Sequence, residues 1–232
     1  MTTSGGGALV ALVLAAGLAL GGCGADEPAD RQSPDEVLAA AKATLDETPG
    51  VHVVLSTEKL PQGISGILNA DGIGTHEPAF EGSLKVVASG ISADAEVVAV
   101  DGVVHAKLPF TTDFEPIDPA DYGAPDPADL MGTEGGLSSL LTSMEDVTEG
   151  AQERDGELLV TEYTGTVPGD VVAGIIPTAS ADTDFDARFT ITDDNVLNEA
   201  VLTGPFYPKG SEDVTYTIRF DRYGTSKDIN AP

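Results

Sequence analysis

Four aspartates in the C-terminal part of the chain have a spacing that suits a calcium ion. Asp182, Asp184, Asp186 and Asp193 occupy places 1, 3, 5 and 12 of a possible calcium-binding loop. Place 6 is Ala187, where the loop needs glycine for its sharp turn, and place 12 needs a bidentate glutamate. The segment also alternates apolar and polar residues like a strand. We therefore expect a solvated acidic strand end and no metal site.

Acid–base chemistry would depend on three histidines, His52, His76 and His105, which are scattered along the chain. The sequence has no G-x-S-x-G elbow, no H-E-x-x-H pair, no Walker loop and no G-x-G-x-x-G after a strand. No residue stands at catalytic spacing from any histidine, and His105 is expected to be a solvated strand residue. We predict that the protein is not an enzyme and needs no cofactor.

The single cysteine, Cys23, is a candidate for covalent lipid attachment. It follows an apolar run over residues 8–20, which is too short to cross a hydrocarbon core of about 30 Å but suits a signal peptide. The run ends in Leu20-Gly21-Gly22-Cys23, which resembles the lipobox of bacterial lipoproteins, where the cysteine is acylated and becomes the first residue. The alternative is a buried free cysteine after an ordinary signal sequence. Neither an internal disulfide nor a multi-cysteine metal site is possible.

The chain is strongly acidic, and all of its charge lies after Cys23. The formal net charge is −28, and the first 22 residues carry no charged side chain. Such a surface repels nucleic acid phosphates and anionic lipid headgroups, because affinity for either needs clustered Lys or Arg. We expect no nucleic acid partner. The apolar content of 41% nevertheless predicts a folded globular domain.

These features divide the chain into three parts. Residues 1–22 are the expected signal peptide, residues 23–32 are the lipidated cysteine with a flexible tether, and residues 33–232 are one domain. Stable membrane binding needs at least two acyl chains, which diacylglycerylated lipoproteins have. We expect a monomer held at the extracytoplasmic face of the cell membrane by this anchor.

The domain should begin with a helix and continue mainly as strands. Ser33-Pro34-Asp35-Glu36 has the N-cap, the early proline and the glutamate of a capping box, and the helix should end near Glu47. Alternating patterns predict strands at 51–57, 64–69, 158–167, 185–192, 199–203 and 214–220, short helices at 137–144 and 169–176, and a loop over 110–129. The consistent class is α+β, a single domain with an antiparallel sheet and helices on one face.

The stretch from Gly82 to Leu108 predicts its own strand register. If Ser89-Gly90 and Asp101-Gly102 are two-residue turns, partners sum to 179 in the first hairpin and to 203 in the second. One face then carries Leu84, Val86, Ala88, Ala93, Ala95, Val97, Ala99 and Ala106. The other face pairs Lys85 with Asp94 and Glu96 with Lys107. These two opposite-charge pairs support the register independently.

The inward face of this meander is unusually rich in alanine. A closely packed core more often uses Val, Leu or Ile at such positions. Either bulky helix side chains fill the space, or an apolar cavity for a ligand remains. The residues alone leave both alternatives open.

Three segments of the domain resemble the LppX/LprAFG family of mycobacterial and related actinobacterial lipoproteins, most closely its LprG branch. They are GISGILNADGIGTHEPAFEGSLKVVASGISADAEVVAVDGVVHAKL (63–108), DPADLMGTEGGLSSLL (126–141) and TYTIRFDRYG (215–224). The resemblance implies a curved antiparallel half-barrel, like the LolA/LolB carriers, with helices on its concave face. It also implies an apolar cavity for the acyl chains of glycolipids, phospholipids or triacylglycerol, and in some members a neighbouring membrane transporter. By position, the cavity lining would include Leu84, Val86, Ala93, Ala95, Val97, Ala99 and Ala106.

Two functions therefore compete. The first is a membrane-anchored carrier that binds lipid or glycolipid and moves or presents it in the cell envelope, with a lipid transporter as a possible partner. The second is an accessory or sensor lipoprotein of an envelope complex, without a lipid cavity. A cavity volume below about 300 Å³ would favour the second function.

Overall fold

The computed structural model describes residues 32–88, 90–109, 111–207 and 212–232. The expected signal peptide, Cys23 and the tether lie outside the described residues, as does Ser89 of the first predicted turn. Within the described part, no helix is long and apolar enough to span a membrane.

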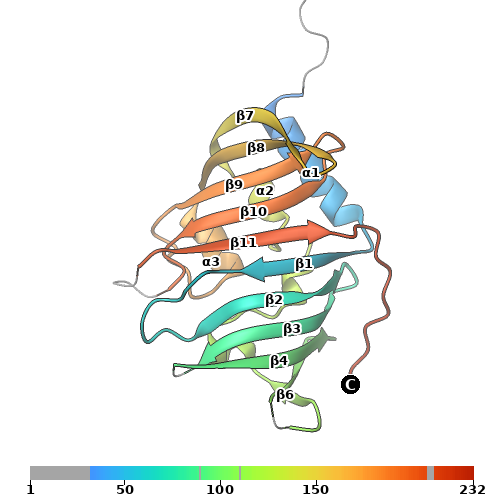
Figure 1. Ribbon diagram of the computed structural model, residues 1–232, viewed down its shortest axis with the longest axis vertical. Helices are drawn as coiled ribbons and strands as arrows, with labels where there is room; N and C mark the ends of the chain where they lie inside the picture. Colours follow the sequence, from blue (N-terminus) through green and yellow to red (C-terminus); the bar gives the residue numbers. More distant parts are fainter. Residues whose placement is uncertain (1–31, 89, 110, 208–211) are drawn as a thin grey trace, which may run out of the picture. The chain divides into compact units, whose positions relative to one another are not determined.

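One open antiparallel sheet of eleven strands forms the framework of residues 32–232 (Figure 1). Its order is β6-β5-β4-β3-β2-β1-β11-β10-β9-β8-β7, so the first strand of the chain lies in the middle and pairs with the last. The strands are β1 (Gly50–Ser56), β2 (Gly66–Thr75), β3 (Ala79–Ala88), β4 (Ile91–Val100), β5 (Val103–Lys107), β6 (Glu115–Ile117), β7 (Glu145–Asp155), β8 (Leu158–Val167), β9 (Phe185–Thr192), β10 (Leu197–Gly204) and β11 (Val214–Asp221). The predicted α+β class with a half-barrel sheet is confirmed.

The helices all lie on one face of this sheet (Figure 1). They are α1 (Pro34–Glu47), α2 (Ser139–Thr142) and α3 (Gly169–Ile175), with the 3₁₀ turns η1 (Pro119–Tyr122) and η2 (Asp129–Met131). The predicted capping box of α1 is present: Glu36 N–H donates to Ser33 Oγ at 3.3 Å, and Ser33 N–H donates to Glu36 Oε2 at 2.8 Å. Leu38, Ala41 and Leu45 of α1 are buried, as its apolar stripe predicts.

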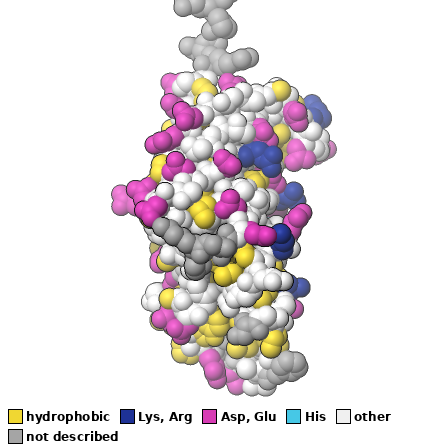
Figure 2. All heavy atoms as spheres, turned by 90° about the vertical axis from the view of Figure 1, so that its left-hand side faces the viewer, with side chains coloured by type: hydrophobic (Ala, Val, Ile, Leu, Met, Phe, Trp, Pro, Cys, Tyr) yellow, Lys and Arg dark blue, Asp and Glu magenta, His cyan; other side chains and the backbone are white. Residues whose placement is uncertain are grey.

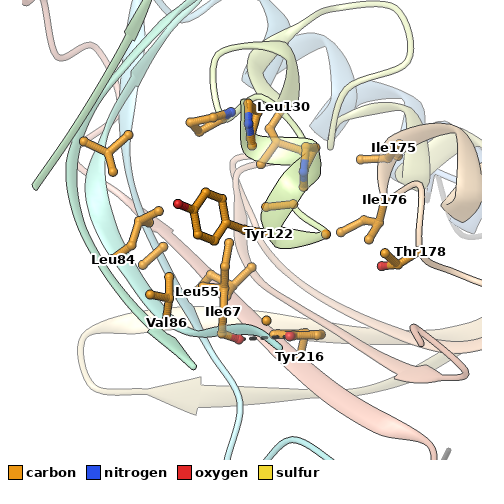
Figure 3. Close-up of a pocket in the computed structure, with 18 of the residues that line it drawn as sticks. Leu55, Ile67, Leu84, Val86, Tyr122, Leu130, Ile175, Ile176, Thr178 and Tyr216 are labelled. Carbon is orange, nitrogen blue, oxygen red and sulfur yellow. Dashed lines mark hydrogen bonds between the residues drawn. The ribbon is translucent and has the colours of Figure 1, made fainter. Parts of the chain in front are cut away.

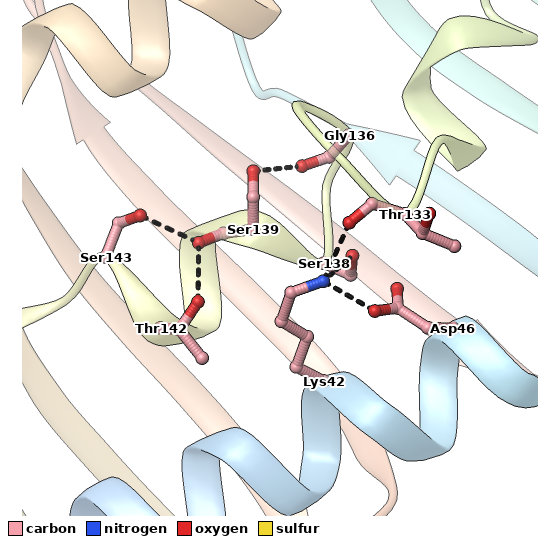
Figure 4. Close-up of polar contacts among 8 residues, drawn as sticks. All are labelled: Lys42, Asp46, Thr133, Gly136, Ser138, Ser139, Thr142 and Ser143. Atoms are coloured by element: carbon pink, nitrogen blue, oxygen red, sulfur yellow. Dashed lines mark hydrogen bonds and ion pairs between the residues drawn. The ribbon is translucent and has the colours of Figure 1, made fainter.

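A lysine on α1 holds the segment that leads into α2 (Figure 4). Lys42 Nζ pairs with Asp46 one turn further along the helix and donates to the Thr133 carbonyl at 2.8 Å and to Ser138 Oγ at 3.2 Å. These contacts span more than 90 residues of chain, since Thr133 is 91 residues from Lys42. They fix α1 and α2 as a unit that covers β7–β11.

The predicted meander register is confirmed pair by pair. Leu84 faces Ala95 and Lys85 faces Asp94, which sum to 179, while Val97 faces Ala106 and Glu96 faces Lys107, which sum to 203. The two opposite-charge pairs are formed, with N–O distances of 3.7 Å for Lys85–Asp94 and 3.1 Å for Lys107–Glu96.

Two strands were not expected, and β2, β3 and β10 are clearly longer than expected. β6 lies inside the predicted loop, and β7 has no apolar face, because ten of its eleven residues are exposed. β2 continues through Gly72 and Gly74 to Thr75, and β3 begins at Ala79, before the predicted stretch that starts at Gly82. These longer strands matter for function because β2 and β3 form part of the floor of an apolar cavity.

Candidate functional site

An apolar cavity lies between the first strands of the sheet and the segments that cover them. Its floor comes from β1–β5, β10 and β11, and its cover from residues 117–131 and from the segment 172–178 around α3. None of the 34 residues that line it has a charged side chain. Its volume is about 170 Å³. That is below the roughly 300 Å³ typical of small-molecule pockets, so an acyl chain would require the cover to move outward.

Five of the seven residues expected to line a cavity do so in the structure: Leu84, Val86, Ala95, Val97 and Ala106 (Figure 3 labels Leu84 and Val86). The other two, Ala93 and Ala99, are not part of its lining. Ala99 is completely buried in the small cluster around Phe80 and Val104, and Ala93 is half-buried nearer the end of the hairpin.

Phe80 is a lining residue that sequence reasoning missed. Its ring lies across the paired glycines Gly72 and Gly82. A Cβ added at Gly72 would fall 2.4 Å from Phe80 Cζ, and one added at Gly82 would fall 2.9 Å from it. The two glycines therefore give the ring a flat seat on the sheet. The signal in the sequence was a pair of glycines inside a strand pattern, which often marks a close approach by another group.

The cover is held to the sheet mainly by apolar side chains. Asp118 caps η1 by accepting from Ala120 N–H at 2.9 Å, and Gly123 ends it with a positive φ of 66°. The backbone hydrogen bonds of residues 119–131 are local or reach only Leu137. A segment with so few backbone bonds to its surroundings can shift at low cost.

The cavity reaches the surface beside the end of β5 and the start of the cover. Leu108 and Tyr122 both line the cavity and are exposed, at 42% and 40%. Figure 3 shows the Tyr122 ring directed toward Leu84, and Figure 2 shows hydrophobic side chains gathering toward the lower end of the molecule, while acidic ones are spread over the view. These two side chains mark the opening.

The polar groups of the cavity wall are hydroxyls. Tyr216 donates to the Ile67 carbonyl at 2.9 Å, so the Tyr207 hydroxyl, 2.7 Å away, must donate to Tyr216 (Figure 3 shows the first bond). Desolvation by burial raises the pKa of both phenols, most strongly at Tyr216. Thr178 adds a hydroxyl whose oxygen is buried.

His52 has carboxylate partners that were not predicted from the sequence. His52 is buried on the outer face of the sheet, with Nδ1 2.7 Å from Asp221 Oδ1 and Nε2 3.0 Å from Asp71 Oδ1. The expectation that no residue stands at catalytic spacing from a histidine is therefore wrong here. Both ring nitrogens are already engaged by carboxylates, so neither nitrogen of His52 is free. Burial raises the pKa of Asp221, but the hydrogen bonds from His52 and Arg222 outweigh it and leave that pKa below its ordinary value.

His105 faces Val98 on the outer face, as predicted, but it is only partly solvated. The residue is half-buried, and its Nδ1 is enclosed without a hydrogen-bond partner among the described residues. Packing explains this, because Val98 belongs to an outer-face cluster with Ala79 and Ile229 of the C-terminal tail. In the described ranges no group of three His, Cys, Asp or Glu residues is arranged to hold a metal ion.

The outer face also carries a second, more open hollow of about 410 Å³. It is lined by both acidic and basic groups, including Asp71, Glu81, Arg222 and Lys227. Glu81 and Lys227 pair across it at 3.1 Å. We regard the smaller inner cavity as the candidate site, because its lining is mostly apolar and has no charged side chain, whereas the charges of the outer hollow are mutually paired or solvated.

Comparison with known proteins identifies the class. The sequence matches the model of LppX/LprAFG lipoproteins over residues 33–230, so the chain belongs to this lipoprotein family. Its structure is similar to LprF from Mycobacterium bovis (TM-score 0.69, 16% identity, 86% of this chain and 96% of that one). It is also similar to lipoprotein LppX from Mycobacterium tuberculosis (TM-score 0.63, 16% identity, 85% and 98%). At this identity the two structures establish the shared fold. Comparison with curated protein sequences gave no match.

Proposed function

We propose that this protein is a non-enzymatic lipid-binding lipoprotein that carries or presents (glyco)lipids or phospholipids in the cell envelope. The observation that carries the proposal is the enclosed cavity with 34 lining residues and no charged side chain among them. Each methylene buried there contributes about 0.8 kcal/mol, so even part of one acyl chain provides substantial affinity. Membership of the lipoprotein family supports the same function.

Binding would proceed by displacement of the cover. Residues 119–131 lie over the sheet without backbone bonds to its strands, so an acyl chain can separate them without breaking the sheet. The chain would enter beside Leu108 and Tyr122, and a polar headgroup would remain in water at this opening. Cys23, acylated after removal of residues 1–22, would hold the domain at the extracytoplasmic face of the membrane through the tether 23–32.

The test is native mass spectrometry of the full chain carrying Cys23→Ala, which prevents acylation. We expect co-purifying lipid, and we expect Leu84→Trp to expel it because the indole occupies the floor of the cavity. Ser83→Trp is the matched control, since Ser83 is exposed on the outer face of the same strand. A lipid-free protein after mild extraction, or equal lipid content in both tryptophan variants, would overturn the proposal.

The volume of about 170 Å³ favours a second function, an accessory or sensor lipoprotein whose cavity never opens. Hydrogen exchange separates the two functions. Opening of the cover predicts that amides of residues 119–131 exchange faster than those of β9 and β10, and that added lipid slows them. Slow exchange of the cover with no response to lipid would support the accessory function.

Membrane attachment is tested separately. The Cys23→Ala chain should appear in the soluble fraction and keep its lipid, because the anchor and the cavity are distinct parts of the proposal. Loss of lipid binding in that variant would show that the two are coupled. A transporter partner and a monomeric state remain part of the proposal, and crosslinking in membranes together with analytical ultracentrifugation would test them.

A further inference from the structure

Thr178 presents a buried hydroxyl without a partner at the wall of the cavity. It follows α3 and Pro177 and lies on the α3 side of the cavity (Figure 3). Its Oγ1 is shielded from solvent and has no hydrogen-bond partner among the described residues. A buried hydroxyl in this position costs stability, because it gives up its bonds to water and gains none in return.

In the closed cavity the cover packs against the methyl group of Thr178. A Cβ added at Gly123 of the cover would fall 3.3 Å from the methyl carbon of Thr178, so that methyl packs against the turn that ends η1. Gly123 has a φ of 66°, where residues with side chains are strained. The turn at Gly123 thus brings the backbone close to the methyl group of Thr178. The hydroxyl is bonded to the same carbon, Cβ, as this methyl group.

The other buried hydroxyls of the lining already donate their protons in hydrogen bonds. Tyr216 donates to the Ile67 carbonyl, and Tyr207 donates to Tyr216. Thr178 is therefore the buried hydroxyl in this wall that can still donate. No lining residue offers a charge to neutralise an ionised ligand group, and an unpaired charge in an apolar enclosure is very costly.

We propose that Thr178 Oγ1 is a hydrogen-bonding subsite inside the cavity for one neutral oxygen of a bound lipid, either an ester carbonyl or a hydroxyl. The subsite selects lipids whose glycerol-ester region enters the cavity over pure hydrocarbon chains, and it excludes charged groups from that depth. This inference rests on the proposed function, because it needs a lipid in the cavity.

The experiment compares Thr178→Val, which keeps the shape and removes the hydroxyl, with Thr178→Ser, which keeps the hydroxyl. Both are made in the full chain carrying Cys23→Ala. Binding of 1,2-dioleoylglycerol and of octadecane is measured by displacement of the neutral fluorescent probe N-phenyl-1-naphthylamine. We expect Thr178→Val to weaken diacylglycerol binding by roughly tenfold, as loss of one buried hydrogen bond predicts, and to leave octadecane binding unchanged. Thr178→Ser should retain diacylglycerol binding.

A stability measurement makes the test independent of probe behaviour. Removal of an unpartnered hydroxyl should raise the Tm of the Thr178→Val protein by a few degrees, so this variant should be more stable and yet bind diacylglycerol less well. Equal diacylglycerol affinity in wild type and Thr178→Val would overturn the subsite and leave the proposed function intact. A wild-type chain that binds neither molecule would refute the proposed function and the subsite with it.

Discussion

The two halves of the sheet are closed in different ways. The solid half, β7–β11 under α1 and α2, is filled by large side chains, including Phe185, Phe189 and Leu45, each at most 2% exposed. The hollow half, β2–β6 under residues 117–131, has a small cluster dominated by Ala95, Ala99 and Ala106. Large side chains fill the space beneath α1 and α2 in the first half. Short side chains in the second half leave space for the cavity, which also borders β10 and β11.

The difference shows how one sheet can serve two purposes. Bulky inner-face residues interlock with α1 and provide most of the stability, since burial scales with apolar area. Alanines and glycines on the same face give up that contribution and create space instead. The solid half can therefore hold the fold together while the cover of the hollow half moves.

The largest expected effect comes from matched truncations of two leucines. Leu45→Ala in the solid half should lower the free energy of unfolding by about 2–5 kcal/mol, because it leaves a void in a tightly packed core. Leu84→Ala in the hollow half should cost about 1 kcal/mol, because Leu84 is only partly buried and borders existing space. Urea denaturation measures both. Equal losses would show that the hollow half is packed as tightly as the solid half.

Enlarging an alanine should have opposite effects in the two halves. Ala187→Leu adds volume to the large core cluster of the solid half, which is already full, and should destabilise the fold by about 1–3 kcal/mol. Ala95→Leu projects into the cavity and should leave stability unchanged or raise it by up to about 1 kcal/mol. It should also reduce the lipid retained in native mass spectrometry. Destabilisation by Ala95→Leu of the same size would contradict the comparison.

The hollow half was the more predictable from sequence. Two tight turns join β3, β4 and β5, so pair sums of 179 and 203 determine every partner, and Lys85 and Asp94 verify them without long-range information. The alanine face followed from that register. Closure over it did not, because residues 117–131 are a proline-rich segment whose position depends on apolar packing against distant residues, such as that of Ala128 against Phe80.

The formation of β7 and the contacts of His52 depend on strand pairing that no tight turn in the sequence determines. β7 reads EDVTEGAQERD and is almost wholly exposed, so it has no periodicity to detect and forms because β8 supplies a partner edge. His52 meets Asp71 and Asp221, which are 19 and 169 residues away. The pairing of the first strand with the last brings Asp221 opposite His52, and nothing local in the sequence indicates that contact.

The seam between the halves contains a buried tyrosine that joins them directly. Tyr216 of β11 donates to the Ile67 carbonyl of β2, across the intervening β1. On the solid side, Tyr223 donates to the Leu197 carbonyl at 2.7 Å. Burial raises the pKa of both phenols above the ordinary value of 10.0. Each therefore stays protonated in the folded protein at a pH where it ionises in the unfolded chain.

Alkaline unfolding tests whether this seam is as tightly closed as the solid half. Because the folded pKa is raised, the contribution of each tyrosine is complete below pH 10 and is lost as the pH rises above it. Each tyrosine should reduce the free energy of unfolding by about 1.4 kcal/mol between pH 9 and pH 11. Tyr223→Phe and Tyr216→Phe should each flatten the pH dependence by this amount, measured by urea denaturation across that range. Tyr216 borders the cavity, so if only Tyr223→Phe flattens the pH dependence, water enters the cavity and reaches the Tyr216 hydroxyl, and the cavity is not sealed at the seam.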